Sequence, residues 1–187
     1  MMRRIILIVF LAVMCLGVGL VLSYGIEDST PKPVPPQSPE VWKDPQSGLT
    51  WQVSPTGGRM KWSASKAHCA SLSLGGHSDW RLPTINELRS LIRGCQATQK
   101  GGSCGVTDSC LNISCWKDPC KGCSDKGGPG QGGAYWPPEL SGILYWWYWS
   151  SSPIADYASA AWIVGFRGGL VKNYDFADDK LAVRCVR

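Results

Sequence analysis

Hydrophobic and polar positions alternate most clearly in short runs near the two ends of the stretch that follows residue 40. Residues 49–53 alternate with a period of two, which predicts a short strand with one buried face. Residues 162–166 and 170–174 are two further strand-like runs, and the paired glycines between them predict a hairpin. The closing residues 182–187 are expected to form a last strand.

Two segments show helical spacing instead. Residues 63–72 place small side chains on one face, and Ser63 is expected to be the N-cap of this helix. The second helix is better marked, because Thr84 and Glu87 have the spacing of a capping box and an apolar stripe follows them. Gly94 is expected to end this helix as its C′ residue.

From the end of the second helix to Tyr145 the chain has almost no hydrophobic periodicity. An irregular stretch of this length is uncommon in a folded domain unless something replaces the apolar core. Eight cysteines remain after the first hydrophobic segment, and six of them lie between Cys95 and Cys123. We therefore expect disulfides to stabilise this region, which requires an oxidising compartment.

The N-terminal residues 1–25 resemble a signal peptide. Arg3 and Arg4 precede an uncharged apolar run, and Ser23 and Gly25 are small residues at the −3 and −1 positions of a cleavage site. The alternative is an uncleaved anchor, because the run is near the lower length limit for crossing a bilayer. Both interpretations predict an exported protein that is secreted, periplasmic or on the cell surface.

The remainder divides into a linker and one domain. Prolines recur through residues 26–40, which favours an extended, semi-rigid linker. Residues 41–187 have the usual size of one domain. The formal net charge of +5 permits a weak preference for acidic partners such as sulfated glycans, but it does not indicate nucleic-acid binding.

Four short motifs resemble those of one known family. They are DWRLPTINEL at residues 79–88, YWSSS at 148–152, AWIVGF at 161–166 and VRCVR at 183–187. In this order they resemble the bacterial Lcl C-terminal-domain-like family, typified by the Legionella collagen-like adhesin. The resemblance implies an α+β, C-type-lectin-like fold, related to the formylglycine-generating and sulfatase-modifying fold. Such a fold has two helices, a twisted antiparallel sheet and a long loop region, which is disulfide-rich here.

The resemblance also implies a disulfide between Cys69, in the first helix, and Cys185, in the last strand. The other six cysteines would then pair among themselves: Cys95, Cys104, Cys110, Cys115, Cys120 and Cys123. The sequence does not choose among their connectivities; we predict Cys95 with Cys104, and the last four with one another. A zinc site on Cys120 and Cys123 is the alternative, but it lacks a second closely spaced pair.

Motifs for catalysis are missing from the sequence. Its two histidines, His68 and His77, accompany no serine on a nucleophile elbow, and no phosphate-binding or dinucleotide motif occurs. We therefore predict a protein that is not an enzyme, with no catalytic residue and no cofactor. The usual calcium-loop motifs of C-type lectins are also missing, although Asp175, Asp178 and Asp179 are a candidate group for a hard cation.

Two segments are candidate ligand surfaces. Trp146, Trp147 and Tyr148 belong to a run of five aromatic residues, and strand neighbours alternate sides, so some of them are expected to be exposed. The alternative is that both faces of this strand are covered.

The second candidate surface is on the terminal hairpin, where cationic and amide groups suit sulfate or carboxylate. Its members are Arg167, Lys172, Asn173 and Tyr174. The alternative is an ordinary polar face of the hairpin.

These observations favour an exported, non-enzymatic binding module of the bacterial envelope or surface that is adhesin-like and glycan-binding. The expected partner is a sulfated or acidic polysaccharide, with membrane contact only through an uncleaved N-terminal segment. A scaffold domain that binds another envelope protein is the alternative, and an enzyme of the sulfatase-modifying fold is a distant third.

Overall fold

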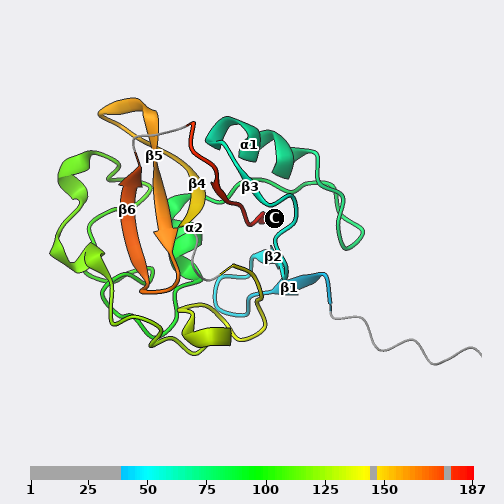
Figure 1. The fold of residues 1–187 in the computed structure, drawn as a ribbon, viewed down its shortest axis with the longest axis horizontal. Coiled ribbons are helices and arrows are strands. Elements are labelled where there is room, and N and C mark those ends of the chain that lie inside the picture. The colour runs from blue at the N-terminus through cyan, green and yellow to red at the C-terminus, as the bar shows by residue number, and fades with distance from the viewer. Residues whose placement is uncertain (1–38, 144–146, 175–177) are drawn as a thin grey trace, which may run out of the picture. The chain divides into compact units, whose positions relative to one another are not determined.

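A computed structural model describes residues 39–143, 147–174 and 178–187 of the chain (Figure 1). The predicted signal peptide or anchor, and nearly all of the predicted linker, lie outside these residues. Seven strands and two α-helices follow in the order β1 (Val41–Lys43), β2 (Thr50–Gln52), β3 (Arg59–Met60), α1 (Trp62–Ala70), α2 (Ile85–Ser90), β4 (Trp147–Ile154), β5 (Tyr157–Gly165), β6 (Leu170–Tyr174) and β7 (Leu181–Ala182). Three 3₁₀ turns lie between α2 and β4, at Ile113–Cys115, Asp118–Lys121 and Gln131–Gly133. The fold is α+β.

The main sheet has five strands in the order β3-β7-β4-β5-β6, and β1 pairs with β2 in a separate antiparallel sheet. The predicted hairpin is confirmed: β5 and β6 are antiparallel, with Gly165 opposite Leu170 (Figure 1). The main sheet is mixed rather than wholly antiparallel, because β4 and β7 run parallel. The predicted last strand is shorter than expected, since β7 ends at Ala182. Beyond it, the Cys185 N–H donates to the side chain of Gln52, at 2.7 Å.

The two helices differ in how well the sequence predicted them. The capping box of α2 is confirmed, because the Thr84 N–H donates to the Glu87 carboxylate at 2.8 Å and the Thr84 hydroxyl accepts from the Glu87 N–H. The expected C′ role of Gly94 is wrong, since α2 already ends at Ser90. Ser63 is not an N-cap either, because α1 begins one residue earlier and its N-cap is Lys61.

Four disulfides cross-link the domain, joining Cys69 to Cys185, Cys95 to Cys123, Cys104 to Cys120 and Cys110 to Cys115. The first of these is the pair that the resemblance implies. The predicted Cys95–Cys104 pair is wrong. Of the last four cysteines, Cys110 and Cys115 pair with each other as predicted, but Cys120 and Cys123 pair with Cys104 and Cys95 instead. The reason is that the Cys123 N–H donates to the Gly168 carbonyl, at 2.8 Å, so the loop folds back on the β5–β6 turn and reaches Cys95. Disulfides of this number indicate an oxidising environment.

Tryptophan N–H groups also hold the irregular region to the sheet. Trp162, on β5, donates to the Leu111 carbonyl at 3.0 Å, and Trp116 donates from the loop to the Val171 carbonyl, on β6, at 2.8 Å. Buried indole N–H groups need acceptors, and carbonyls of a loop or of an edge strand such as β6 need donors, so each such bond satisfies both. The irregular region is therefore part of the packed domain.

Candidate functional site

The aromatic run on β4 is not a ligand surface in the way the sequence predicted. Tyr148 has no exposed surface and packs edge-on against Phe166, with ring centroids 5.4 Å apart. Trp149 is equally buried, in a second apolar cluster on the other face of the strand. Both faces of β4 are therefore covered, which corrects the assignment of Tyr148 to the surface. Trp147 is half-buried, and Trp146 lies outside the described residues.

The four residues of the terminal hairpin do not converge on one anion site. Arg167 lies in the β5–β6 turn, where its guanidinium binds the Asp125 carboxylate at 2.5 and 2.6 Å. Tyr174 lies at the far end of β6 and donates its hydroxyl to Asp179 at 2.8 Å. Lys172 is exposed, while its neighbour Asn173 is half-buried and is directed to the opposite face of the strand.

The candidate metal and catalytic residues are not assembled into sites. Asp178 forms an ion pair with Lys61 at 2.8 Å, and Asp175 lies outside the described residues. Cys120 and Cys123 belong to two different disulfides, so they do not form a zinc knuckle. Within the described ranges no group of three His, Cys, Asp or Glu side chains could hold a metal ion, and no helix is long and apolar enough to cross a membrane.

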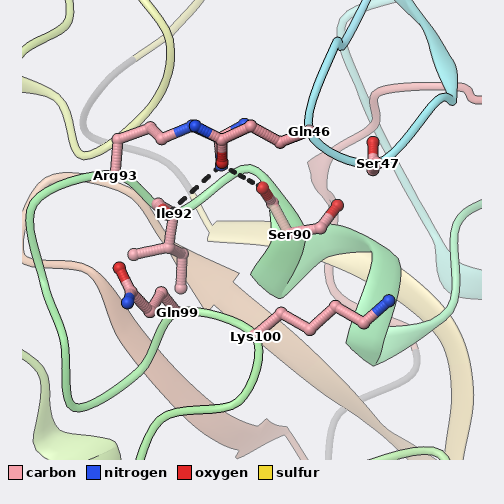
Figure 2. A pocket seen from close by; sticks show the side chains of 7 residues that line it. All are labelled: Gln46, Ser47, Ser90, Ile92, Arg93, Gln99 and Lys100. Atoms are coloured by element: carbon pink, nitrogen blue, oxygen red, sulfur yellow. Dashed lines mark hydrogen bonds between the residues drawn. The ribbon is translucent and has the colours of Figure 1, made fainter.

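A different region carries the chemistry of a binding site. A pocket of about 250 Å³ lies beside the C-terminal end of α2, and we call it the polar pocket (Figure 2). One wall comes from the β1–β2 turn and the opposite wall from the loop after α2. Its lining consists of two amides, two hydroxyls, two cations and one apolar residue: Gln46, Gln99, Ser47, Ser90, Arg93, Lys100 and Ile92.

The first wall is built on the buried carboxylate of Asp44. It accepts from the Gln46 N–H at 3.0 Å, from the Ser47 hydroxyl at 2.7 Å and from Arg93 at 3.0 and 3.1 Å. Burial acts to raise the pKa of Asp44, but the hydrogen bonds from Ser47, Gln46 and Arg93 outweigh it and hold this pKa below its ordinary value. Asp44 therefore fixes the turn and neutralises Arg93, whose side chain is only 17% exposed.

The second wall is built on Arg89, which points from α2 into the interior and is 1% exposed. Its guanidinium donates to the carbonyls of Thr98 at 2.8 Å, Gln99 at 3.0 Å and Val106. Burial lowers the pKa of Arg89, but a guanidinium stays protonated in proteins. Among the described residues no carboxylate forms an ion pair with Arg89. Its guanidinium therefore binds the loop carbonyls instead, and these bonds hold the loop in place.

The groups left over for a ligand are the side-chain amides of Gln46 and Gln99 and the Lys100 ammonium. None of the three makes a hydrogen bond or ion pair within the part of the chain that the structure describes. The serine hydroxyls are already used, Ser47 by Asp44 and Ser90 by the Glu87 carbonyl at 2.6 Å. The pocket thus presents two amides and one cation.

No pattern in the sequence predicts this pocket. Its two walls are about fifty residues apart in the chain, and Gln99 and Lys100 lie in the stretch without periodicity. The only available signal was Asp44, with a serine three residues later and a glycine after that, which is typical of a side-chain-stabilised turn. That pattern predicts a turn but not what faces it.

The model of the family described as the Lcl C-terminal domain matches residues 40–187, a range that contains the described strands and α-helices and the polar pocket. No curated protein matches the chain.

Proposed function

The chain belongs to the Lcl C-terminal domain family, and we propose that it is an exported, non-enzymatic module that binds an acidic polysaccharide in the polar pocket. The observation that carries this proposal is the set of uncommitted donors at Gln46, Gln99 and Lys100. The four disulfides support export, because such bonds persist in oxidising compartments. The C-type-lectin-like arrangement of the fold remains an expectation from the resemblance.

The three groups suit a charged sugar for a chemical reason. A side-chain amide donates and accepts, so it can bind a sugar hydroxyl in either direction. An ammonium group forms charge-assisted hydrogen bonds with a carboxylate or sulfate, which are stronger than neutral ones. The pocket volume of about 250 Å³ is below that of sites for drug-sized ligands, and it suits a single sugar unit of a longer chain.

For binding of an acidic polysaccharide, the Lys100 cation in the polar pocket matters more than the net charge of the protein. The chain has 19 Lys and Arg against 14 Asp and Glu, but two of its arginines, Arg89 and Arg184, are buried and bonded to backbone carbonyls. A weakly basic protein adheres to polyanions without any site, so retention on an anionic column is not sufficient evidence.

The test compares two single-charge variants, Lys100→Ala and Lys172→Ala. Both lysine side chains are exposed, and neither ammonium group has a partner among the described residues, so each change removes one free surface cation. Calorimetric titration with an acidic oligosaccharide is expected to show about a tenfold weaker affinity for Lys100→Ala, which corresponds to one lost charge-assisted bond. The Lys172→Ala variant is expected to stay within about twofold of the original protein.

The same experiment separates the competing functions. Equal losses in the two variants would mean binding by net charge only, and a larger loss in Lys172→Ala would place the ligand on the terminal hairpin. Capture of one envelope protein that saccharide does not displace, together with no saccharide affinity, would favour the scaffold function.

A further inference from the structure

The polar pocket continues into a second hollow. This hollow of about 260 Å³ shares Gln46 and Arg93 with the polar pocket, and we call it the proline groove because four prolines line it. Its other lining residues include Trp42 and Glu139. Two hollows that share part of one wall suit neighbouring units of one linear ligand.

Trp42 combines an unused indole N–H with a partly exposed side chain in the proline groove. Its indole N–H has no acceptor among the described residues, and the side chain is half-buried on β1 at the edge of the core. By comparison, four of the described tryptophans donate to a backbone carbonyl, and two others with an unused N–H are fully buried; the first four are Trp62, Trp116, Trp149 and Trp162, and the buried two are Trp51 and Trp136. A partly exposed indole with an unused N–H in a groove suits an uncharged sugar, whose apolar face packs on the ring while a hydroxyl accepts the hydrogen bond.

Charge changes sign along the two hollows. The free cation of the polar pocket is Lys100, whereas the middle is occupied by the neutralised pair of Arg93 and Asp44. The proline groove carries the exposed carboxylate of Glu139. An anionic group on the sugar beside Trp42 would therefore lie near a like charge, and like charges oppose binding.

From this arrangement we infer that the ligand is a linear polysaccharide with one anionic group on every second sugar. The charged sugar occupies the polar pocket beside Lys100, and its uncharged neighbour packs on Trp42 in the proline groove. The inference rests on the proposed function of the polar pocket, and it adds a ligand class: a sparsely charged acidic chain is bound in preference to one sulfated at every unit.

Three hexasaccharide probes test the inference by calorimetry on the purified, fully oxidised protein. They are a chain of alternating glucuronate and N-acetylglucosamine, a glucose chain sulfated on every unit, and an uncharged N-acetylglucosamine chain. The alternating probe is expected to bind about tenfold more tightly than either of the others, since it alone satisfies both the cation and the uncharged subsite.

Two variants, Glu139→Gln and Trp42→Phe, test whether the proline groove causes the preference for the alternating probe. Glu139→Gln is expected to narrow the preference for the alternating over the fully sulfated probe about fivefold, whereas Glu40→Gln, an equal charge change at an exposed residue outside both hollows, leaves that ratio unchanged. Trp42→Phe keeps an aromatic ring in the core but removes the N–H, and it is expected to weaken the alternating probe about threefold to tenfold.

The outcomes also distinguish the inference from the proposed function. Tighter binding of the fully sulfated probe, or an unchanged ratio in Glu139→Gln, would overturn the inference while a loss in Lys100→Ala would leave the polar pocket in place. No loss with any probe in Lys100→Ala would overturn both.

Discussion

Replacement of Arg89 by methionine is the sharpest test of how the loop after α2 is held. Arg89 lies in the interior with 1% of its surface exposed, and its guanidinium binds the carbonyls of Thr98, Gln99 and Val106. Methionine keeps an unbranched apolar stem of similar length but has no donor. The change therefore leaves three loop carbonyls without their partner while it conserves most of the packing.

The expected loss in the free energy of unfolding follows from those three carbonyls. A buried acceptor that loses its donor costs about 1–3 kcal/mol, and hydrogen bonds from charged donors are at the upper end of that range. Part of the loss is offset, because the variant no longer buries a charge without a paired carboxylate. We expect the free energy of unfolding to fall by about 3–4 kcal/mol, which for a domain of this size lowers Tm by about 6–16 °C.

Differential scanning calorimetry at neutral pH measures this loss, and Arg167→Met is the control. Arg167 is also bidentate, to Asp125, but the two side chains are 44% and 55% exposed, so its removal is expected to cost less than about 1 kcal/mol. Amide hydrogen exchange should also speed up at Lys100, whose N–H donates to the Arg89 carbonyl at 3.2 Å. If the free energies of unfolding of Arg89→Met and the Arg167→Met control differ by less than about 1 kcal/mol, Arg89 does not hold the loop carbonyls as described.

Three further changes test other parts of the account. Serine at both Cys69 and Cys185, which are 116 residues apart, should cost about 4–5 kcal/mol in urea denaturation, and a loss below about 1 kcal/mol would contradict the cross-link. Asp44 has a lowered pKa in the folded protein, so its stabilisation is present at neutral pH and is lost as the pH falls below about 4. Asp44→Asn should therefore lower Tm at neutral pH, and its Tm should fall less steeply than that of the original protein as the pH drops below about 4. An equally steep fall of Tm in the two proteins would refute this. In Gly102→Ala a Cβ would lie 2.1 Å from the Gln96 carbonyl oxygen, so a loss of about 2–3 kcal/mol is expected, and a neutral effect would show that the backbone yields.

Local signals in the sequence were reliable where the structure depends on neighbours in the chain. The capping box at Thr84 and Glu87 and the hairpin around Gly168 need only a few adjacent residues, and both are present. The N-cap at Ser63 failed, because the long-range bond of Trp62 to the Ser150 carbonyl, at 2.7 Å, places Trp62 in the first turn of the helix.

Long-range features were not accessible in the same way. Cysteine pairing in the loop depends on how the chain returns to the β5–β6 turn, so Cys95 meets Cys123 rather than the nearer Cys104. The aromatic run on β4 predicted alternation correctly, but not that both faces would be covered. The polar pocket joins Gln46 to Lys100 only because a buried guanidinium orders the second wall, and no sequence pattern describes that contact.

Chemical-shift mapping during titration with the alternating hexasaccharide tests the central claim most directly. Side-chain amide signals report the polar pocket at Gln46 and Gln99, and the indole N–H signal reports the proline groove at Trp42. We predict saturable shifts of these three signals while the Asn173 amide, on the terminal hairpin, stays unchanged. Shifts centred on Asn173, or no saturable shift at Gln46 and Gln99, would contradict the account.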